Sequence, residues 1–211
     1  VVPELMPRAL FWFRWGAAWT WIFGAMLLFL LYYMGPNTFS PLSDLAGEKP
    51  PFGTWIQPFA ILFVGFIVYD LIFKSLPHNV GVILWGAIAC AFAWYLSSQL
   101  EFSARAVFIH VGALFGTSMA ANVWMRIWPA QQRIITAIKN GEAPDAADPA
   151  LAGLRSKHNT YMSVPLLLYM VSVDQPQMIG ADPVLWVPIT LILGFGLTYA
   201  IYKKVPSVKG F

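Results

Sequence analysis

Long apolar runs alternate with short polar interruptions along the chain. We predict six membrane-spanning helices from the runs Arg8–Met34, Thr54–Phe73, Val80–Ser98, Ser103–Trp128, Lys157–Val173 and Val184–Tyr202. A helix needs about 20 mostly apolar residues to cross the hydrocarbon core of a bilayer, and most of these runs come close to that length. The pattern therefore predicts an all-α fold, a polytopic helical bundle in a membrane.

The interruptions between the runs indicate how the helices are connected. The second and third runs are joined by the short turn Leu76–Asn79, which predicts an antiparallel hairpin. The longest interruption, Pro129–Ser156, is polar and contains "NGEAPDAADPA". We expect it to be a surface loop, with room for two further turns of the fourth helix before Gly141.

Composition supports the membrane class. Only 11% of the 211 residues are charged and 58% are apolar, whereas soluble domains average about 25% charged residues. The sequence contains no internal repeat, and we expect residues 1–211 to form a single membrane domain. Because the chain begins with Val1 rather than methionine, we expect it to be part of a longer protein. Its single cysteine, Cys90, allows no intrachain disulfide, and the sequence contains no CxxCH motif for attaching haem.

The basic residues predict the orientation. Six spans would place 11 of the 13 lysines and arginines on one side of the membrane. These residues are Arg8, Arg14, Lys74, Arg126, Arg133, Lys139, Arg155, Lys157, Lys203, Lys204 and Lys209. Basic loops stay in the cytoplasm, so this side should be cytoplasmic. Orientation and lipid headgroups thus explain the net charge of +3, and no nucleic-acid partner is needed.

His110 lies inside the apolar stretch "VFIHVGALFGT" of the fourth run. The positions three, four and seven residues away are mostly small, which leaves space for a flat ligand or a close helix. Imidazole is a common axial ligand of haem iron, so haem ligation is one interpretation. A neutral histidine bonded to a neighbouring helix is the other, and both stay open.

A second polar group lies at the start of the fifth run, in "RSKHNTYMSVP". Arg155, His158 and Asn159 offer a planar fork of donors, a titratable nitrogen and an amide. They favour either a site for an anion or cofactor or an interface with lipid headgroups. His158 and His110 are about 25 Å apart in depth along their helices, so they cannot ligate one haem together.

The other polar residues have simpler interpretations. Asp70 and Lys74 are four residues apart, which predicts an ion pair on one helix. Arg14 and Arg126 lie just inside the cytoplasmic boundary, where they can extend to the headgroups or pair with a haem propionate. His78 lies in the hairpin turn and is expected to be exposed at the membrane interface.

Three stretches together resemble one family. The fourth run reads "IHVGALFGTSMAANVWMRIWPAQQRII", the fifth "RSKHNTYMSVPLLLYMVS" and the first "FWFRWGAAWTWIFGAMLLFLLYY". They resemble the membrane domain of the bacterial membrane-bound urate oxidases (urate hydroxylases), which is normally fused to a cytochrome c. The matching positions are His110, Asn122, Arg126, His158, Asn159 and Tyr161.

The resemblance implies a function and a site. It implies a multi-pass protein of the bacterial inner membrane that oxidises urate and passes electrons through haem b to a c-type cytochrome. Among the matching positions, we expect His158 and Asn159 to be catalytic and His110 to be a haem ligand. Arg155 joins the catalytic residues because it lies beside them at the start of the fifth run, and Arg126 and Arg14 are expected to pair with the haem propionates. His158 is an alternative haem ligand. The family also has a preceding histidine-bearing helix and a C-terminal cytochrome c, which we expect outside the sequence given.

Two other functions stay open. The chain can be a non-catalytic membrane subunit of a larger respiratory or photosynthetic electron-transfer complex. It can also be a transporter of copper or another metal, although its helices lack the methionine and cysteine clusters that soft metals prefer.

Overall fold

The computed structural model describes residues 2–172 and 182–208, most of which are helical. In chain order the elements are α1 (Val2–Leu28), η1 (Phe29–Tyr33), α2 (Phe52–Ser75), α3 (His78–Ser98), α4 (Ala104–Asn122), η2 (Val123–Ile127), α5 (Trp128–Lys139), α6 (Ala147–Ser172), α8 (Pro183–Lys204) and η3 (Val205–Ser207). Within the described residues, extended pairing is limited to one bridge between Phe39 and Phe102. The predicted all-α fold is confirmed.

Five helical segments of the described chain are long and apolar enough to cross a membrane. They are Glu4–Tyr33, Phe52–Ser75, His78–Ser98, Ala104–Lys139 and Pro183–Ser207. These segments match five of the six predicted spans, with ends that agree to within a few residues except where the fourth continues to Lys139, which supports a multi-pass membrane protein. The remaining predicted span, Lys157–Val173, falls on α6, whose first half is too polar for α6 to be among the five. Its last residue, Val173, and Lys209 lie outside the described residues.

The predicted continuation of the fourth helix before Gly141 is confirmed, but the prediction of a surface loop over the rest of Pro129–Ser156 is mostly wrong. α4, η2 and α5 form one continuous helical rod that reaches Lys139. Pro129 has no N–H group to donate to the preceding turn, and the Met125 carbonyl in that turn accepts from Arg126 Nη1 instead. α6 then begins at Ala147, whose backbone N–H donates to the Asp145 carboxylate over 2.9 Å. Only the residues between α5 and α6 remain as a connection.

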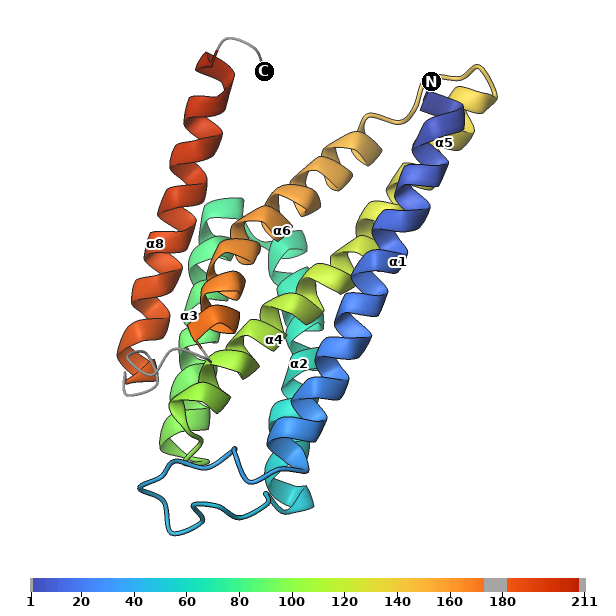
Figure 1. Ribbon diagram of the computed structural model, residues 1–211. Helices are drawn as coiled ribbons and strands as arrows, with labels where there is room; N and C mark the ends of the chain where they lie inside the picture. Colours follow the sequence, from blue (N-terminus) through green and yellow to red (C-terminus); the bar gives the residue numbers. More distant parts are fainter. Residues whose placement is uncertain (1, 173–181, 209–211) are drawn as a thin grey trace.

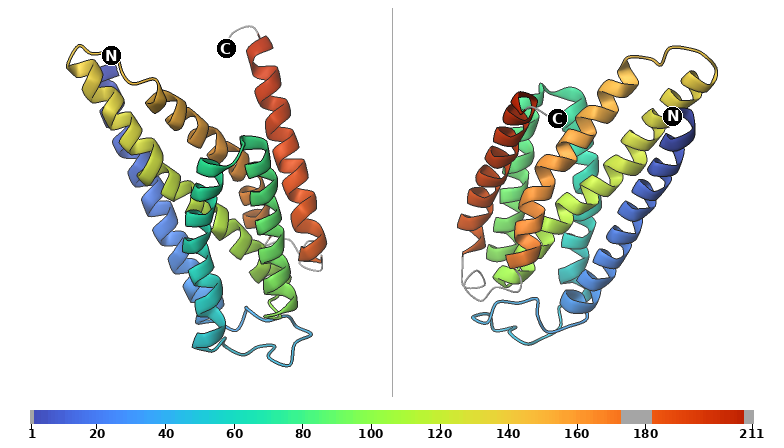
Figure 2. Two further views of the ribbon diagram at one scale, coloured as in Figure 1. Left: turned by 180° about the vertical axis from the view of Figure 1, so that it is seen from behind. Right: turned by 45° about the horizontal axis from the view of Figure 1, so that its top comes forward.

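The helices alternate in direction, as the sequence pattern predicts. The start of α1, the turn between α2 and α3, the connection between α5 and α6 and the end of α8 point toward one end of the bundle (Figures 1 and 2). We call this the basic end. The connection between η1 and α2 lies at the opposite end. The structure thus confirms which segments share an end, whereas the assignment of the basic end to the cytoplasm stays a prediction.

α4 forms the centre of the bundle. It packs against α1, α2, α3, α6 and α8, and most of its side chains are buried. Small residues permit these close contacts: a Cβ atom on Gly112 would lie 3.2 Å from a methyl group of Leu166 on α6. The polar residues of α4 are therefore held deep inside the protein.

The outer surface is strongly apolar. Trp12 on α1, Ile83 on α3 and Ile192 on α8 are each more than 70% exposed, and many other large apolar side chains are exposed around the bundle. Soluble monomers rarely expose apolar surface so extensively. This surface is suited to contact with lipid chains.

Candidate functional site

Asp70, near the end of α2, is the centre of an ion-pair cluster at the basic end. Its carboxylate accepts hydrogen bonds from Arg155 Nη2 at 2.9 Å and Arg126 Nε at 2.8 Å, and it pairs with Lys74 Nζ at 2.8 Å. We call these four residues the Asp70 cluster. The predicted pair of Asp70 with Lys74 is confirmed, but three cations share this one carboxylate. The cluster as a whole is positively charged.

Arg155 is the most deeply placed cation of the cluster. Its side chain is only 2% exposed, and its guanidinium lies over the ring of Tyr69 at 5.2 Å from the centroid. Its Nε and Nη1 atoms are buried without a hydrogen-bond partner among the described residues. Unpaired buried donors are uncommon in proteins, so Arg155 has unused capacity to interact with negative charge.

Five polar side chains form a hydrogen-bonded series across the bundle, which we call the amide–imidazole chain. Its members, from the interior to the surface, are Asn159, Asn122, Tyr69, His158 and His78. The Asn122 amide nitrogen donates to Asn159 Oδ1 and to the Tyr69 hydroxyl, both over 2.9 Å. The Tyr69 hydroxyl lies 2.7 Å from His158 Nδ1, and His158 Nε2 lies 3.3 Å from His78 Nδ1.

One arrangement of protons gives every link in this chain a donor and an acceptor. The Tyr69 oxygen accepts from Asn122, so its own O–H donates to His158 Nδ1. Neutral His158 then carries its proton on Nε2 and donates it to His78. From Asn122 outward, the donors therefore point toward His78, which is exposed, whereas the second N–H of Asn122 points inward to Asn159.

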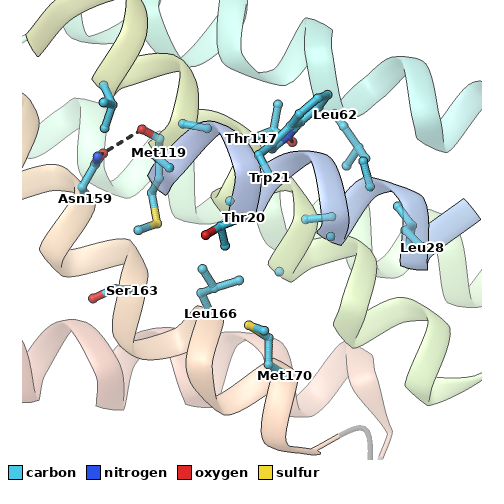
Figure 3. A pocket seen from close by; sticks show the side chains of 18 of the residues that line it. Thr20, Trp21, Leu28, Leu62, Thr117, Met119, Asn159, Ser163, Leu166 and Met170 are labelled. Carbon is cyan, nitrogen blue, oxygen red and sulfur yellow. Dashed lines mark hydrogen bonds between the residues drawn. The ribbon is translucent and has the colours of Figure 1, made fainter. Parts of the chain in front are cut away.

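A cavity of about 490 Å³ lies between α1, α2, α4 and α6, and we call it the central cavity (Figure 3). Its walls are mainly apolar and small, and its polar lining residues are concentrated on α6. The lining residues include Ala17, Thr20, Trp21, Gly24, Ala25, Leu28, Phe59, Leu62, Gly112, Ala113, Gly116, Thr117, Met119, Ala120, Ser156, Asn159, Thr160, Ser163, Leu166 and Met170. Thr20, Gly24 and Thr160 are exposed, so the cavity opens between α1 and α6.

Asn159 connects this cavity to the amide–imidazole chain. Its amide nitrogen donates to the Met119 carbonyl over 3.1 Å (Figure 3), and its oxygen accepts from Asn122. A carboxamide has two N–H donors and two acceptor lone pairs. Asn159 therefore keeps one donor and one acceptor position beside the cavity.

His110 lies toward the opposite end and is fully buried. Its Nε2 bonds to the Tyr33 hydroxyl at 2.8 Å, and its Nδ1 bonds to the Ala106 carbonyl at 2.6 Å. Tyr33 ends η1, a π-helical turn in which both Tyr32 and Tyr33 are buried. Both nitrogens of His110 thus have partners within the bundle, which matches the interpretation as a packing histidine.

The residues present do not fit a haem held by the predicted ligands. His110 does not line the central cavity, and its Nε2 faces Tyr33. His158 does not line it either, and both of its ring nitrogens are hydrogen-bonded. His158 and His78 line a second cavity of about 80 Å³, which is much too small for a porphyrin. In the described residues, no group of three or more histidine, cysteine, aspartate or glutamate side chains is arranged to hold a metal ion.

Two further predicted residues lie apart from these groups. The Arg14 guanidinium lies over the Trp128 ring at 4.0 Å from its centroid and ties α1 to the α4–α5 rod. Tyr161 stacks on Tyr202 of α8 and lines the 80 Å³ cavity. Arg14 therefore connects two helices at the basic end, and its predicted pairing with a haem propionate is untested.

Sequence reasoning brought together the correct helix ends but missed several partners. Arg126 and Arg155 do meet, through Asp70, and Asn122 and Asn159 are hydrogen-bonded. The role of Tyr69 was not predicted, although it directly precedes Asp70 in an otherwise apolar helix. Trp21 was also missed because tryptophan is common in membrane helices.

Comparison with known proteins gives one match. A family model described as "Urate oxidase N-terminal" matches residues 1–205. Searches of curated proteins and of solved structures give no match. The family match thus covers nearly the whole chain, including every residue of the Asp70 cluster, the central cavity and the amide–imidazole chain.

Proposed function

We propose that this chain, which belongs to the urate oxidase N-terminal family, is the membrane domain of an enzyme that binds urate in the central cavity and oxidises it. A c-type cytochrome receives the electrons, and the domain works in the inner membrane of a bacterium. The central cavity, with Asn159 in its wall, is the observation that carries this proposal.

The central cavity has a suitable size and shape for a flat heterocycle. Its volume of about 490 Å³ lies within the range of roughly 300–1,000 Å³ that is usual for small-molecule sites. Gly112, Ala113 and Gly116 make the middle of the α4 wall flat, between the larger side chains of Ile109 and Met119 on the same helix. A planar ring can lie against such a wall.

Trp21 supplies an aromatic surface in this cavity. Its indole N–H donates to the Thr117 hydroxyl over 3.0 Å, and its ring contacts Phe63 edge to face. These two contacts fix the plane of the indole. Stacking of a nucleobase on an aromatic side chain contributes about 1–3 kcal/mol, and urate has the same bicyclic ring system as a purine base.

Asn159 supplies polar recognition at the cavity wall. Its remaining donor and acceptor positions match the adjacent N–H and C=O groups on the edge of urate. Asn122 and the Met119 carbonyl hold the amide in place, so little rotational freedom is lost on binding. Hydroxyl groups of Ser156, Thr160 and Ser163 lie on the same helix.

The Asp70 cluster supplies the charge that an anion needs. Urate is a monoanion at neutral pH, and an anion in an apolar cavity is stable only near compensating positive charge. Arg155 directly precedes Ser156, which lines the cavity. Low dielectric strengthens the field of a buried guanidinium, so Arg155 acts on the substrate without contacting it.

The chemistry requires water and an electron acceptor. Hydroxylation of the urate monoanion forms a bond between a ring carbon and the oxygen of water, and it releases one proton and two electrons. Two ferric haems of a c-type cytochrome accept these electrons. Haem b is left out of this proposal because His110 and His158 do not fit it. His158 contacts Tyr69 rather than the cavity, so we assign it a positioning role.

Replacing Asn159 with aspartate tests the recognition by its amide. Asn159→Asp keeps the shape but places a carboxylate beside an anion. Hydrogen bonds to charged groups contribute about 1.5–3 kcal/mol, so the urate Kd should rise about 10- to 150-fold. Asn140→Asp, the same change at an exposed position at the end of α5, is the control and should leave urate binding unchanged.

Replacing Trp21 tests the cavity by a second route. Trp21→Leu should weaken urate binding by about tenfold or more. Trp19→Leu, on the exposed face of the same helix, should have no effect. If folded wild-type protein with its c-type cytochrome neither binds urate nor reduces the cytochrome, the proposal is wrong, and a non-catalytic membrane subunit becomes the better account.

A further inference from the structure

The amide–imidazole chain connects the exposed His78 to an amide in the central cavity through four successive hydrogen bonds. Each link is between 2.7 and 3.3 Å long. Tyr69, His158 and Asn122 are nearly inaccessible, so none of them can exchange its partner for bulk water. The direction of each hydrogen bond is therefore set by its neighbours in the chain.

A proton taken up by the imidazole pair reverses this direction. With one more proton, His158 carries hydrogen on Nδ1, whichever of the two rings bears the charge, because the Nε2–Nδ1 bond to His78 is shared. His158 Nδ1 then donates to the Tyr69 oxygen instead of accepting from it. The Tyr69 hydroxyl hydrogen loses its acceptor inside the protein.

Rotation of two amides restores an acceptor for Tyr69. If Asn122 turns over, its Oδ1 accepts from Tyr69, and this oxygen has no hydrogen-bond partner among the described residues in the present orientation. Asn159 must then turn as well, because its oxygen would otherwise face the Asn122 oxygen. Turning Asn159 breaks its bond to the Met119 carbonyl and exchanges the donor and acceptor that face the cavity.

We propose that His78 is a positioning residue for the central cavity: a proton on the His78–His158 pair switches the orientation of the Asn159 amide and so weakens substrate binding. The effect on urate rests on the proposed function, whereas the amide switch does not. The neutral pair presents the amide in the binding orientation, and the protonated pair presents the reverse one.

Imidazole is the side-chain type that gains a proton near neutral pH. Burial and the nearby Arg155 and Lys157 disfavour the charge on His158, so exposed His78 carries the charge shared by the two imidazoles. Their charged or titratable neighbours are Lys157 and Tyr161 in the 80 Å³ cavity, Arg155 against Tyr69, and Asp70 with Lys74 on α2. Side chains of these types normally change charge outside the range from about pH 6 to pH 8. A pH response in this range therefore reports the imidazoles.

Nitrogen NMR of selectively ¹⁵N-labelled protein tests the switch without urate. Between about pH 6 and pH 8, the side-chain amide resonances of Asn159 should shift together with the ring nitrogens of His158. In Tyr69→Phe, which removes only the hydroxyl, and in His78→Ala, the Asn159 resonances should no longer follow pH in this range. Asn79→Ala, the exposed neighbour of His78, should behave as wild type.

Urate binding gives the second readout. The wild-type Kd should rise about tenfold from pH 8 to pH 6, within the usual range of coupling between two sites. His78→Ala should show less than about a twofold change, because the coupling between the proton and the urate site is lost. The switch would be overturned if, in the wild type, the Asn159 amide resonances stay constant over the pH range in which the histidine ring nitrogens shift. A pH-dependent amide in a protein that binds no urate would support the switch and refute the proposed function.

Discussion

Removing the negative charge of Asp70 should destabilise the protein strongly. Asp70→Asn keeps the side-chain shape but leaves Arg155, which is 2% exposed, without a carboxylate partner. Breaking a buried ion pair by neutralising one partner costs about 3–5 kcal/mol, because a buried charge remains uncompensated. Lys74 adds little to this cost, since its side chain is 53% exposed.

The assay can use the single cysteine of the chain. For a protein of this size, 1 kcal/mol shifts the melting temperature by about 2–4 °C, so Asp70→Asn should melt about 6–20 °C lower. Cys90 is half-buried on α3, and a thiol-reactive fluorophore reports its exposure during thermal unfolding in detergent. Asp148→Asn is the matched control. Its partner Arg133 is 58% exposed, so the midpoint should hardly move.

A double variant identifies the cause of the loss. Asp70→Asn combined with Arg155→Leu removes both buried charges, so much of the lost stability should return. Equal melting temperatures of Asp70→Asn and Asp148→Asn would show that the buried charge of Arg155 does not need the Asp70 carboxylate. If the double variant is no more stable than Asp70→Asn, the stability lost in Asp70→Asn does not come from the unpaired guanidinium.

Three further predictions follow from the same contacts. Arg155→Ala should lower urate turnover at least about tenfold, whereas Lys157→Ala, at an exposed position, should lower it less than about twofold. Equal, small effects of both changes would mean that the Asp70 cluster only anchors the protein at the membrane interface. A cysteine placed at Ala146, in a variant without the native cysteine, should react with an impermeant reagent only after cells are opened; labelling of intact cells would reverse the predicted orientation. The hydrogen bond from Arg133 lowers the pKa of Asp148, so this pair stabilises the protein above the unfolded carboxyl pKa of about 3.9 and is lost as the pH falls below it. Asp148→Asn should remove that part of the acid dependence in thermal melts, and it should cost only a little stability at pH 7 because Arg133 is largely exposed.

The spans could be predicted from the sequence because membrane helices must satisfy their backbone internally over a fixed thickness. The short connection between α5 and α6 could not be predicted from the sequence. The stretch from Pro129 to Ser156 is polar and contains glycine and prolines, which read as a loop. The end of α5 and the start of α6 extend beyond the apolar runs, so hydropathy does not predict them. The ion pair between Arg133 and Asp148 connects these two helix ends.

Part of the candidate site could be predicted in the same way. Consecutive helices are often neighbours, which correctly brought Arg126 close to Arg155. Their shared partner Asp70 was missed because Lys74, four residues away, already explained that carboxylate. Likewise, Tyr33 is 77 residues from His110, and no local pattern connects a buried imidazole with a hydroxyl at that separation. Which residues of different helices contact each other depends on how the helices pack. The hydrophobic periodicity of a single helix does not indicate this.

Urate-dependent reduction of a c-type cytochrome tests the central claim most directly. Purified wild-type protein in lipid discs is mixed with ferric cytochrome and urate, and ferrous haem is followed by absorbance while urate loss is measured in the same sample. The proposed function predicts two haems reduced for each urate consumed, with the rate strongly lowered in Asn159→Asp and unchanged in Asn140→Asp. Reduction that does not require urate, or that is equally fast in the two variants, would contradict urate oxidation in the central cavity.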